Sequence, residues 1–236
     1  MNLILLTPED FLTPHRVALT DRRLEHIRKV IRPQIGDCLS CGLINGKMGK
    51  GTLVSLSRQG AELEVLLDQD PPPPLPLTLV LALPRPKMLK RIMATVTSLG
   101  VKKIYLINSR RVEKSFWQSG FSDDKKLFRY MALGLEQARD TSLPNLHIKR
   151  YFAPFVKDEL PGIARDGLKI LAHPKTDRVC PAGINEPATL VIGPEGGFID
   201  QEVDTLAEIG FAPHSIGPRI LKVETAVTHL ISRLYT

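Results

Sequence analysis

Residues 188–226 read ATLVIGPEGGFIDQEVDTLAEIGFAPHSIGPRILKVETA, and this stretch decides the fold class. Its opening, ATLVIGP, is a mostly apolar run, which is typical of a strand buried on both faces of a parallel sheet. A glycine-rich loop follows at 193–197, and a helix is predicted over about 200–208, ending at Gly210. A buried strand, a loop and a helix in this order indicate an α/β unit.

The same alternation extends back over most of the chain. Four further apolar runs predict strands: LTLVLALP, KKIYLIN, LHIKRY and LKILAHP. Helices are predicted over 88–99, 123–139 and 223–234. Strands alternating with helices predict a parallel α/β sheet, in which ligands bind outside the carboxyl ends of the strands. Attention therefore falls on the loops LAHPK, IGPEGGF and SIGPRILKVETA.

The first 70 residues have a different texture. GDCLSCGLI, GTLVSLS and AELEVLLD are short strand-like runs, Asn45-Gly46 supplies a turn, and a short helix is predicted over 22–30. Four consecutive prolines at 71–74 separate this part from the rest. We therefore expect two domains, a small β-barrel over 1–70 and the α/β domain over 71–236.

Positive charge is concentrated in parts of the chain. The formal net charge is +7, but residues 71–150 hold fifteen basic and five acidic side chains. Six more cations lie close together near the start: Arg16, Arg22, Arg23, Arg28, Lys29 and Arg32. Charge gathered in this way suits an anionic polymer such as a nucleic acid, and a solvated basic face explains it equally well.

Neither a membrane nor a metal is expected. No apolar run approaches the roughly 20 residues that span a bilayer. The opening MNLILLTPED does not resemble a secretory signal, so we expect a cytoplasmic protein. The three cysteines form no disulfide framework, and the side chains of Cys38 and Cys41 point to opposite faces of a predicted strand. We expect structural cysteines and no metal site.

Two of the loops at the predicted sheet edge could hold a ligand. There is no GxxxxGK[ST], and no G-x-G-x-x-G opens a helix after a strand, so neither a P-loop NTPase nor a dinucleotide enzyme is supported. IGPEGGF fits either a tight turn or a ligand loop. In the second loop, Ile220 and Leu221 lie between Arg219 and Lys222, with Glu224 at the start of a helix. A pocket for a ligand with an apolar part beside an anion would need this mixture.

IGPEGGF, followed about twenty residues later by GPRILKVETA, resembles the C-terminal half of the SPOUT-class RNA methyltransferases. The chain is most similar to the family that methylates N3 of a uridine in 16S ribosomal RNA (the uracil-1498 activity). HIRKVIRPQIGD, the stretch from LALPRPK to SLGVKKIYLINSRR, and EQARDTSLPNL extend the resemblance over nearly the whole chain. The chain departs from the family at Lys222, where Arg is common, at Ser98, where Glu is common, and in its less basic opening.

The resemblance implies a PUA-like β-barrel followed by a SPOUT-like α/β domain with a deep trefoil knot, which pattern alone would never indicate. It also implies S-adenosylmethionine as the cofactor, 16S ribosomal RNA in the small ribosomal subunit as the partner, and a homodimer whose active site borrows from the second subunit. The implied cofactor-binding residues are Leu171, Ala172, His173, Ile192, Gly193, Glu195, Gly197, Ile216, Gly217, Ile220, Leu221, Thr225 and Ala226.

Roles follow for the charged residues. Arg219 or Lys222 would stabilise the uridine as N3 loses its proton, and Glu224 would act as the base or orient Arg219 through a salt bridge. His173, at a strand end, is more typical of a pocket wall than of a general base. The expected RNA-binding residues are Arg22, Arg23, Arg28, Lys29, Gln137 and Arg139.

Two alternatives stay open. A non-catalytic RNA-binding or ribosome-assembly protein on the same scaffold would bind RNA without turnover. A SPOUT-class methyltransferase for a different RNA would share these motifs. Trp117 could stack on a base, although a single tryptophan is more often part of the packing.

Overall fold

The computed structural model describes residues 2–118 and 123–235 and divides the chain into two compact units. Unit 1 comprises Met1–Pro73 and Met131–Leu143, and unit 2 comprises Pro74–Tyr130 and Pro144–Thr236. The boundary between the units falls within helix α4 (Asp124–Ala138), between Tyr130 and Met131. We expected Met131–Leu143 to belong to the C-terminal domain, whereas this segment belongs to unit 1.

Packing explains this difference. Leu3 and Leu5 form a buried cluster with Ala132 and Leu135 of α4. The backbone N–H of Leu3 donates to the Glu136 carbonyl at 3.0 Å. A helical sequence pattern reveals an apolar face but not the partner that covers it. The sequence therefore predicted the helix and missed the partner of its C-terminal half.

Unit 1 is built on a curled sheet of six strands in the order β1-β4-β5-β6-β3-β2. Only the β1–β4 pair is parallel, and in the described part of the chain the edge strands β1 and β2 do not pair with each other. The elements are β1 (Ile4–Leu6), a 3-10 turn (Pro8–Asp10), β2 (Phe11–Thr13), β3 (Arg16–Leu19), α1 (Arg22–His26), a π-helical turn (Ile27–Ile31), β4 (Cys38–Leu43), β5 (Met48–Leu56) and β6 (Ala61–Gln69).

One face of this curled sheet carries the core of unit 1. Along β6, Ala61, Leu63 and Val65 are buried, and the residues between them are more exposed. This alternation is expected where a sheet has one face on the core and one in solvent. Leu24 and Ile27, from α1 and the turn after it, join the same buried cluster.

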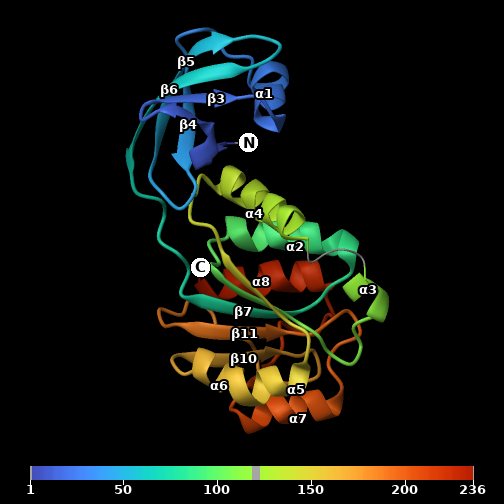
Figure 1. Ribbon diagram of the computed structural model, residues 1–236. Helices are drawn as coiled ribbons and strands as arrows, with labels where there is room; N and C mark the ends of the chain where they lie inside the picture. Colours follow the sequence, from blue (N-terminus) through green and yellow to red (C-terminus); the bar gives the residue numbers. More distant parts are fainter. Residues whose placement is uncertain (1, 119–122, 236) are drawn as a thin grey trace. The chain divides into compact units, whose positions relative to one another are not determined.

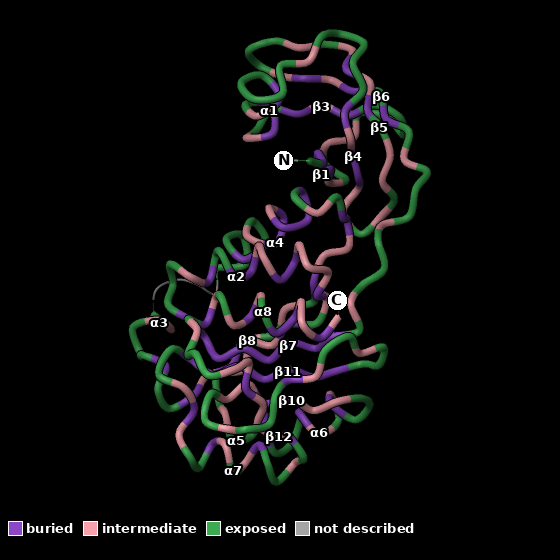
Figure 2. Tube along the Cα trace, turned by 180° about the vertical axis from the view of Figure 1, so that it is seen from behind, coloured by how far each residue is buried: buried purple, intermediate pink, exposed green. Residues whose placement is uncertain are grey.

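Unit 2 is built on a six-stranded sheet in which every neighbouring pair is parallel, as the sequence predicted. The strand order is β12-β10-β11-β7-β8-β9. The strands are β7 (Leu77–Ala82), β8 (Lys103–Ile107), β9 (Asn145–Lys149), β10 (Leu168–Ala172), β11 (Ala188–Ile192) and β12 (Ala212–His214). The central strands β7 and β11 are buried along their whole length (Figure 2), which accounts for their unbroken apolar runs.

Helices cover this sheet in two groups. Figure 1 shows α2 beside α8, and it shows α5, α6 and α7 grouped apart from them. The elements outside the sheet are α2 (Pro86–Ser98), α3 (Lys114–Gln118), α5 (Phe152–Pro154), a π-helical turn (Phe155–Glu159), α6 (Leu160–Ile163), α7 (Asp200–Glu208) and α8 (Val223–Tyr235). None of the helices in the described residues is long and apolar enough to cross a membrane.

The strand order creates a crevice at one edge of the sheet. The chain adds β8 and β9 on one side of β7, then crosses to β10 and returns to place β11 between β10 and β7. At such a switch point the loops that leave neighbouring strands diverge and open a crevice at the carboxyl edge. The predicted trefoil knot stays a prediction.

Candidate active site

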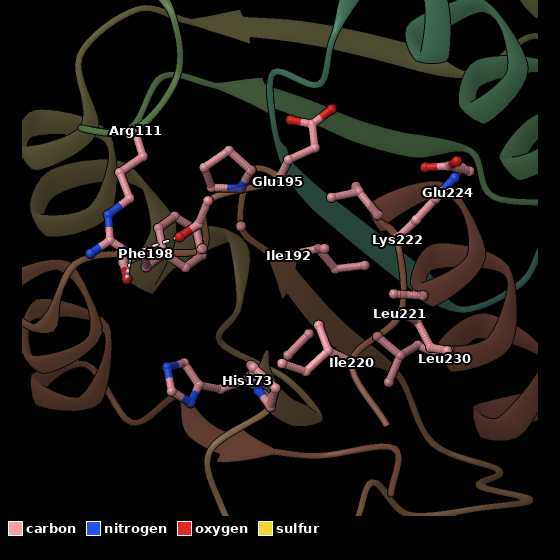
Figure 3. Close-up of a pocket in the computed structure, with 18 of the residues that line it drawn as sticks. Arg111, His173, Ile192, Glu195, Phe198, Ile220, Leu221, Lys222, Glu224 and Leu230 are labelled. Atoms are coloured by element: carbon pink, nitrogen blue, oxygen red, sulfur yellow. Dashed lines mark hydrogen bonds between the residues drawn. The ribbon is translucent and has the colours of Figure 1, made fainter. Parts of the chain in front are cut away.

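A cavity of about 1240 Å³ opens at the carboxyl edge of the sheet in unit 2 (Figure 3). Four segments supply most of its lining, and each follows a different strand: 85–88 after β7, 172–175 after β10, 192–198 after β11 and 214–223 after β12. The pocket therefore lies where the switch in strand order predicts a ligand site. Its walls combine aliphatic side chains with the backbone of glycine-rich loops, a mixture typical of cofactor sites.

The loop after β11 turns tightly against the pocket. The Gly197 N–H donates to the Pro194 carbonyl at 2.8 Å, and Gly197 has a φ of +71°, a conformation that favours glycine. A Cβ atom on Gly193 would lie only 3.1 Å from the Phe198 ring. The lack of a side chain at Gly193 makes room for the Phe198 ring, and the positive φ of Gly197 completes the tight turn.

Arg111 braces this loop from outside the pocket motifs. Its Nη1 donates to the Gly196 carbonyl at 2.6 Å and to the Phe198 carbonyl at 3.4 Å (Figure 3). The Glu195 carboxylate in turn accepts the Arg85 backbone N–H at 3.0 Å. Neither arginine was among the predicted site residues, because Arg111 is 85 residues from Gly196 along the chain.

A second clamp fixes the start of α7 behind the loop. The carboxylate of Glu202 is 7% exposed and accepts the Arg110 backbone N–H at 2.7 Å through Oε1. Its Oε2 accepts the Ile199 N–H at 3.1 Å, which satisfies a free donor at the helix start. The segment after β8 is thus bonded both to the glycine-rich loop and to the helix that follows it.

The loop before α8 forms another wall. Gly217 has a φ of +115°, in the left-handed region that side-chain-bearing residues rarely adopt. The loop is held by a backbone bridge, since the Ser215 N–H donates to the Arg178 carbonyl and the Cys180 N–H donates to the Ser215 carbonyl, both at 2.8 Å. Ile220 lines the pocket although it is 82% exposed, so its side chain offers apolar surface at the mouth.

The three residues predicted to act in catalysis all line the pocket. Arg219 and Lys222 are exposed and Glu224 is half-buried at the start of α8. Figure 3 shows Lys222 and Glu224 extending toward one another on the same side of the pocket. No ion pair joins Arg219 to Glu224 in the described ranges. The expected salt bridge is therefore not formed here, and both groups face the pocket independently.

Most of the predicted cofactor-binding residues also line the pocket, and two do not. Leu171 is fully buried within β10, and Thr225 is exposed on α8 and outside the lining. Being next to a loop residue in sequence does not decide which side of the sheet or helix a side chain occupies. The residues that do line it are Ala172, His173, Ile192, Gly193, Glu195, Gly197, Ile216, Gly217, Ile220, Leu221 and Ala226.

His173 has a local structural partner. Its Nδ1 accepts the Lys175 backbone N–H at 3.2 Å, which holds the turn after β10. The other ring nitrogen, Nε2, could bind a ligand, because His173 lines the pocket. This geometry suits a wall residue that positions a ligand.

The basic residues of unit 1 differ sharply in environment. Arg23 is 7% exposed and four of its N–H groups are taken up by Asp10, Asp21 and the Leu5 carbonyl. Burial disfavours its charge, but the two carboxylates outweigh burial and raise its pKa. Contact between Arg23 and RNA conflicts with this enclosure, and its place is in the core of the unit.

The other predicted RNA-binding residues remain at the surface. Arg28, Gln137 and Arg139 are exposed. Arg22 is half-buried and donates two hydrogen bonds, at 2.6 and 3.0 Å, to the buried carboxylate of Glu136. Arg22 therefore has an internal partner that holds its position.

An exposed ion pair involves the last of these residues. Lys29 lies 2.9 Å from Glu25, one helical turn away. Such exposed pairs contribute little to stability. Lys29 can exchange this partner for a phosphate at little cost.

Of the three cysteines, Cys38 is exposed, and Cys41 and Cys180 are buried. All three are free thiols, and burial raises the pKa of Cys41 to about 12 and that of Cys180 to about 11. Among the described residues, no group of three or more histidine, cysteine or carboxylate side chains could hold a metal ion.

Comparisons with known proteins give consistent results. The model of an RNA methyltransferase domain family matches residues 71–235. The ribosomal RNA small subunit methyltransferase E of Treponema pallidum is 31% identical over 234 residues, covering 96% of this chain and 87% of that protein. The protein named ribosomal RNA small subunit methyltransferase E 1 of Borreliella burgdorferi is 26% identical over 230 residues, covering 96% and 94%.

Solved structures show the same fold at lower identity. The ribosomal RNA small subunit methyltransferase E of Neisseria gonorrhoeae, solved bound to S-adenosyl methionine, has a TM-score of 0.73 at 22% identity and covers 98% of this chain and 96% of that one. A methyltransferase structure from Legionella pneumophila has a TM-score of 0.74 at 22% identity and covers 98% and 95%.

Proposed function

The chain belongs to the RNA methyltransferase family that includes the ribosomal RNA small subunit methyltransferase E proteins. We propose that it uses S-adenosylmethionine to methylate N3 of a uridine in 16S ribosomal RNA, at the uracil-1498 type of site. The observation that carries this proposal is the pocket at the switch point of the sheet. It joins an apolar wall, a glycine-rich backbone and two exposed cations in one place.

The residues present fit S-adenosylmethionine. Ile192, Ile216, Ile220 and Leu221 line the pocket with aliphatic surface suited to an adenine ring. The two glycine-rich loops line the pocket, and their backbone groups can hydrogen-bond to the cofactor. When bound, this cofactor supplies an electrophilic methyl group on a sulfonium.

The protein's own task is to align the uridine and handle its N3 proton. Arg219, exposed at the pocket, stabilises the negative charge that develops on the base as the N3–H bond breaks. Glu224, half-buried and without an ion pair to Arg219 in the described residues, accepts that proton on its carboxylate. Lys222 adds a second cation beside the base.

The proposed partners are RNA, bound by exposed residues of unit 1, and a second copy of the chain. Arg28, Lys29, Gln137 and Arg139 of unit 1 bind the RNA backbone, with residues 1–70 as a PUA-like RNA-binding domain. A homodimer is proposed on the resemblance to the SPOUT-class methyltransferases alone. The enzyme acts on the small ribosomal subunit in the cytoplasm.

The proposal is tested with labelled S-adenosylmethionine. The protein is incubated with naked 16S ribosomal RNA or with assembled small subunits, and the labelled nucleotide is mapped. Label at one uridine of the small subunit is the expected result. Label in a different RNA would favour another SPOUT-class substrate. Tight cofactor or RNA binding without incorporation would favour a non-catalytic protein on the same scaffold.

A further inference from the structure

We propose that Trp117, Arg150 and Tyr151 form a surface that binds unpaired nucleotides next to the methylated uridine; we call these three residues the stacking surface. The inference deepens the proposed function, on which it rests, by naming how the RNA reaches the pocket. None of the three belongs to the pocket lining or to the basic cluster of unit 1.

The stacking surface lies at the same edge of the sheet as the pocket. Arg150 and Tyr151 directly follow β9, and Trp117 lies on α3, which follows β8. The Arg150 guanidinium carbon lies 5.3 Å from the centre of the Trp117 ring. The Trp117 Nε1–H donates to the Asn108 side chain at 2.8 Å, so the indole is anchored by its edge.

Tyr151 is the most unusual member. Tyr151 is 76% exposed, so its ring contributes little to the packing of the core. Exposed aromatic rings and arginine planes are the groups on which proteins stack unpaired bases. Trp117 is held by Asn108 and by the Arg150 guanidinium, so Arg150 and Tyr151 provide two adjacent planar groups on which bases can stack.

Direct packing connects the stacking surface to the pocket. Phe152, the residue after Tyr151, packs on Phe198 with ring centres 5.8 Å apart, and Phe198 lines the pocket. Phe116, the residue before Trp117, lines the pocket as well. The surface therefore begins where the pocket wall ends.

The charges around the stacking surface favour RNA over a protein partner. Arg110, Lys114 and Arg150 are exposed cations on the two segments that build it. Glu113 and Asp158 are exposed acids on the same segments, and Glu159 is paired with Lys149 at 2.5 Å. A polyanion that also presents ring faces suits this arrangement, and single-stranded RNA has both properties.

The test compares substitutions of Tyr151 in the full-length protein. Tyr151→Ala removes the ring and Tyr151→Phe keeps it. Arg165→Ala is the matched charge control for Arg150→Ala, because Arg165 is an exposed arginine just before β10, at the opposite edge of the same sheet. Affinity is measured for naked 16S ribosomal RNA and for a single-stranded oligouridylate, alongside affinity for S-adenosylmethionine and oligomeric state by sedimentation.

The expected result is a loss of RNA affinity of about 5- to 100-fold in Tyr151→Ala, the range typical of losing one stacked base. Arg150→Ala should also weaken RNA binding, whereas Tyr151→Phe, Arg165→Ala and all cofactor affinities should match the wild type. Unchanged RNA affinity in both Tyr151→Ala and Arg150→Ala would overturn the proposal. A change of oligomeric state in Tyr151→Ala would also overturn it, by assigning the surface to a second copy.

These outcomes separate the two proposals. A wild-type protein that methylates RNA normally, with RNA affinity unaffected by the substitutions, would overturn the stacking surface alone. A wild-type protein that methylates no RNA but binds it in a Tyr151-dependent way would overturn the proposed function and support the surface.

Discussion

Arg219 carries the largest part of the proposed chemistry. It is exposed, lines the pocket and has no ion pair in the described residues, so its replacement should not disturb the fold. We expect Arg219→Ala to bind S-adenosylmethionine within a few-fold of the wild type. Single-turnover methylation should fall by about 10²- to 10³-fold, the usual effect of losing one donor that stabilises developing charge.

Measuring cofactor affinity and single-turnover rate on that one variant gives a clear decision. An unchanged rate would remove Arg219 from the chemistry. A fall in cofactor affinity that matched the fall in rate would mean that Arg219 only shapes the loop.

The stability of unit 1 depends on pH in part through Asp21. Burial raises the pKa of Asp21, but hydrogen bonds and charge from Arg23 outweigh burial and lower it overall. A carboxyl group whose pKa is lowered by folding stabilises the protein above its ordinary pKa, and that stabilisation is lost as pH falls below about 4. Asp21→Asn keeps an effective helix cap and removes the charge.

We therefore expect the Asp21→Asn variant to lose less stability than the wild type between pH 5 and pH 3. Urea unfolding at several pH values measures this, with Asp68→Asn, an exposed carboxylate on β6, as the control. Identical acid dependence in the wild type and Asp21→Asn would exclude this contribution.

Among the elements, the loop after β11 depends on a residue that no pocket motif contains. Arg111 donates to the carbonyls of Gly196 and Phe198 and so fixes which way their peptide groups face. We expect Arg111→Ala to weaken S-adenosylmethionine binding by about tenfold, as expected for the loss of a charged hydrogen bond. Arg110→Ala is the matched control, because only the backbone N–H of Arg110 bonds to Glu202.

Calorimetry on the two variants measures this effect. Equal cofactor affinity in Arg111→Ala and Arg110→Ala would show that the loop holds its shape without the guanidinium.

The sequence predicts the strands of unit 2 better than it predicts their order in the sheet. The unbroken apolar runs of β7 and β11 predicted strands of a parallel sheet, because strands buried on both faces need apolar residues throughout. The insertion of β11 between β10 and β7 depends on contacts far apart in the chain, and local patterns do not record them.

The same limit applied to single residues of the site. GPEGG and GPRILKVETA predicted two of the loops that line the pocket, because glycines and mixed apolar and charged residues mark a loop that contacts a ligand. The resemblance implied Leu171 and Thr225 as cofactor-binding residues, although neither lines the pocket, and charge alone suggested Arg23 for RNA binding. The carboxylates that enclose Arg23 become its neighbours through folding.

For the whole molecule, cofactor binding should act on one unit. The pocket is lined by residues of unit 2 alone, and unit 1 has a separate core. We expect S-adenosylmethionine to slow amide hydrogen exchange in 172–175, 192–198 and 214–223, because a ligand stabilises the state that binds it. Exchange in β3, β5 and β6 should stay unchanged.

The full chain is the proper sample for this measurement. A fragment starting at Leu75 would keep residues 131–143 without Leu3 and Leu5, and would expose Leu135, which is otherwise fully buried. Equal protection of both units by the cofactor would contradict a site confined to unit 2.

The identity of the methylated nucleoside tests the central claim most directly. Small ribosomal subunits are treated with the protein and S-adenosylmethionine, and the RNA is digested to nucleosides and separated by chromatography with mass detection. The proposed function predicts 3-methyluridine as the product, with its amount reduced by Arg219→Ala. A methyl group on the ribose or on another base atom, or no methylated product from a protein that binds the cofactor, would contradict methyl transfer to N3.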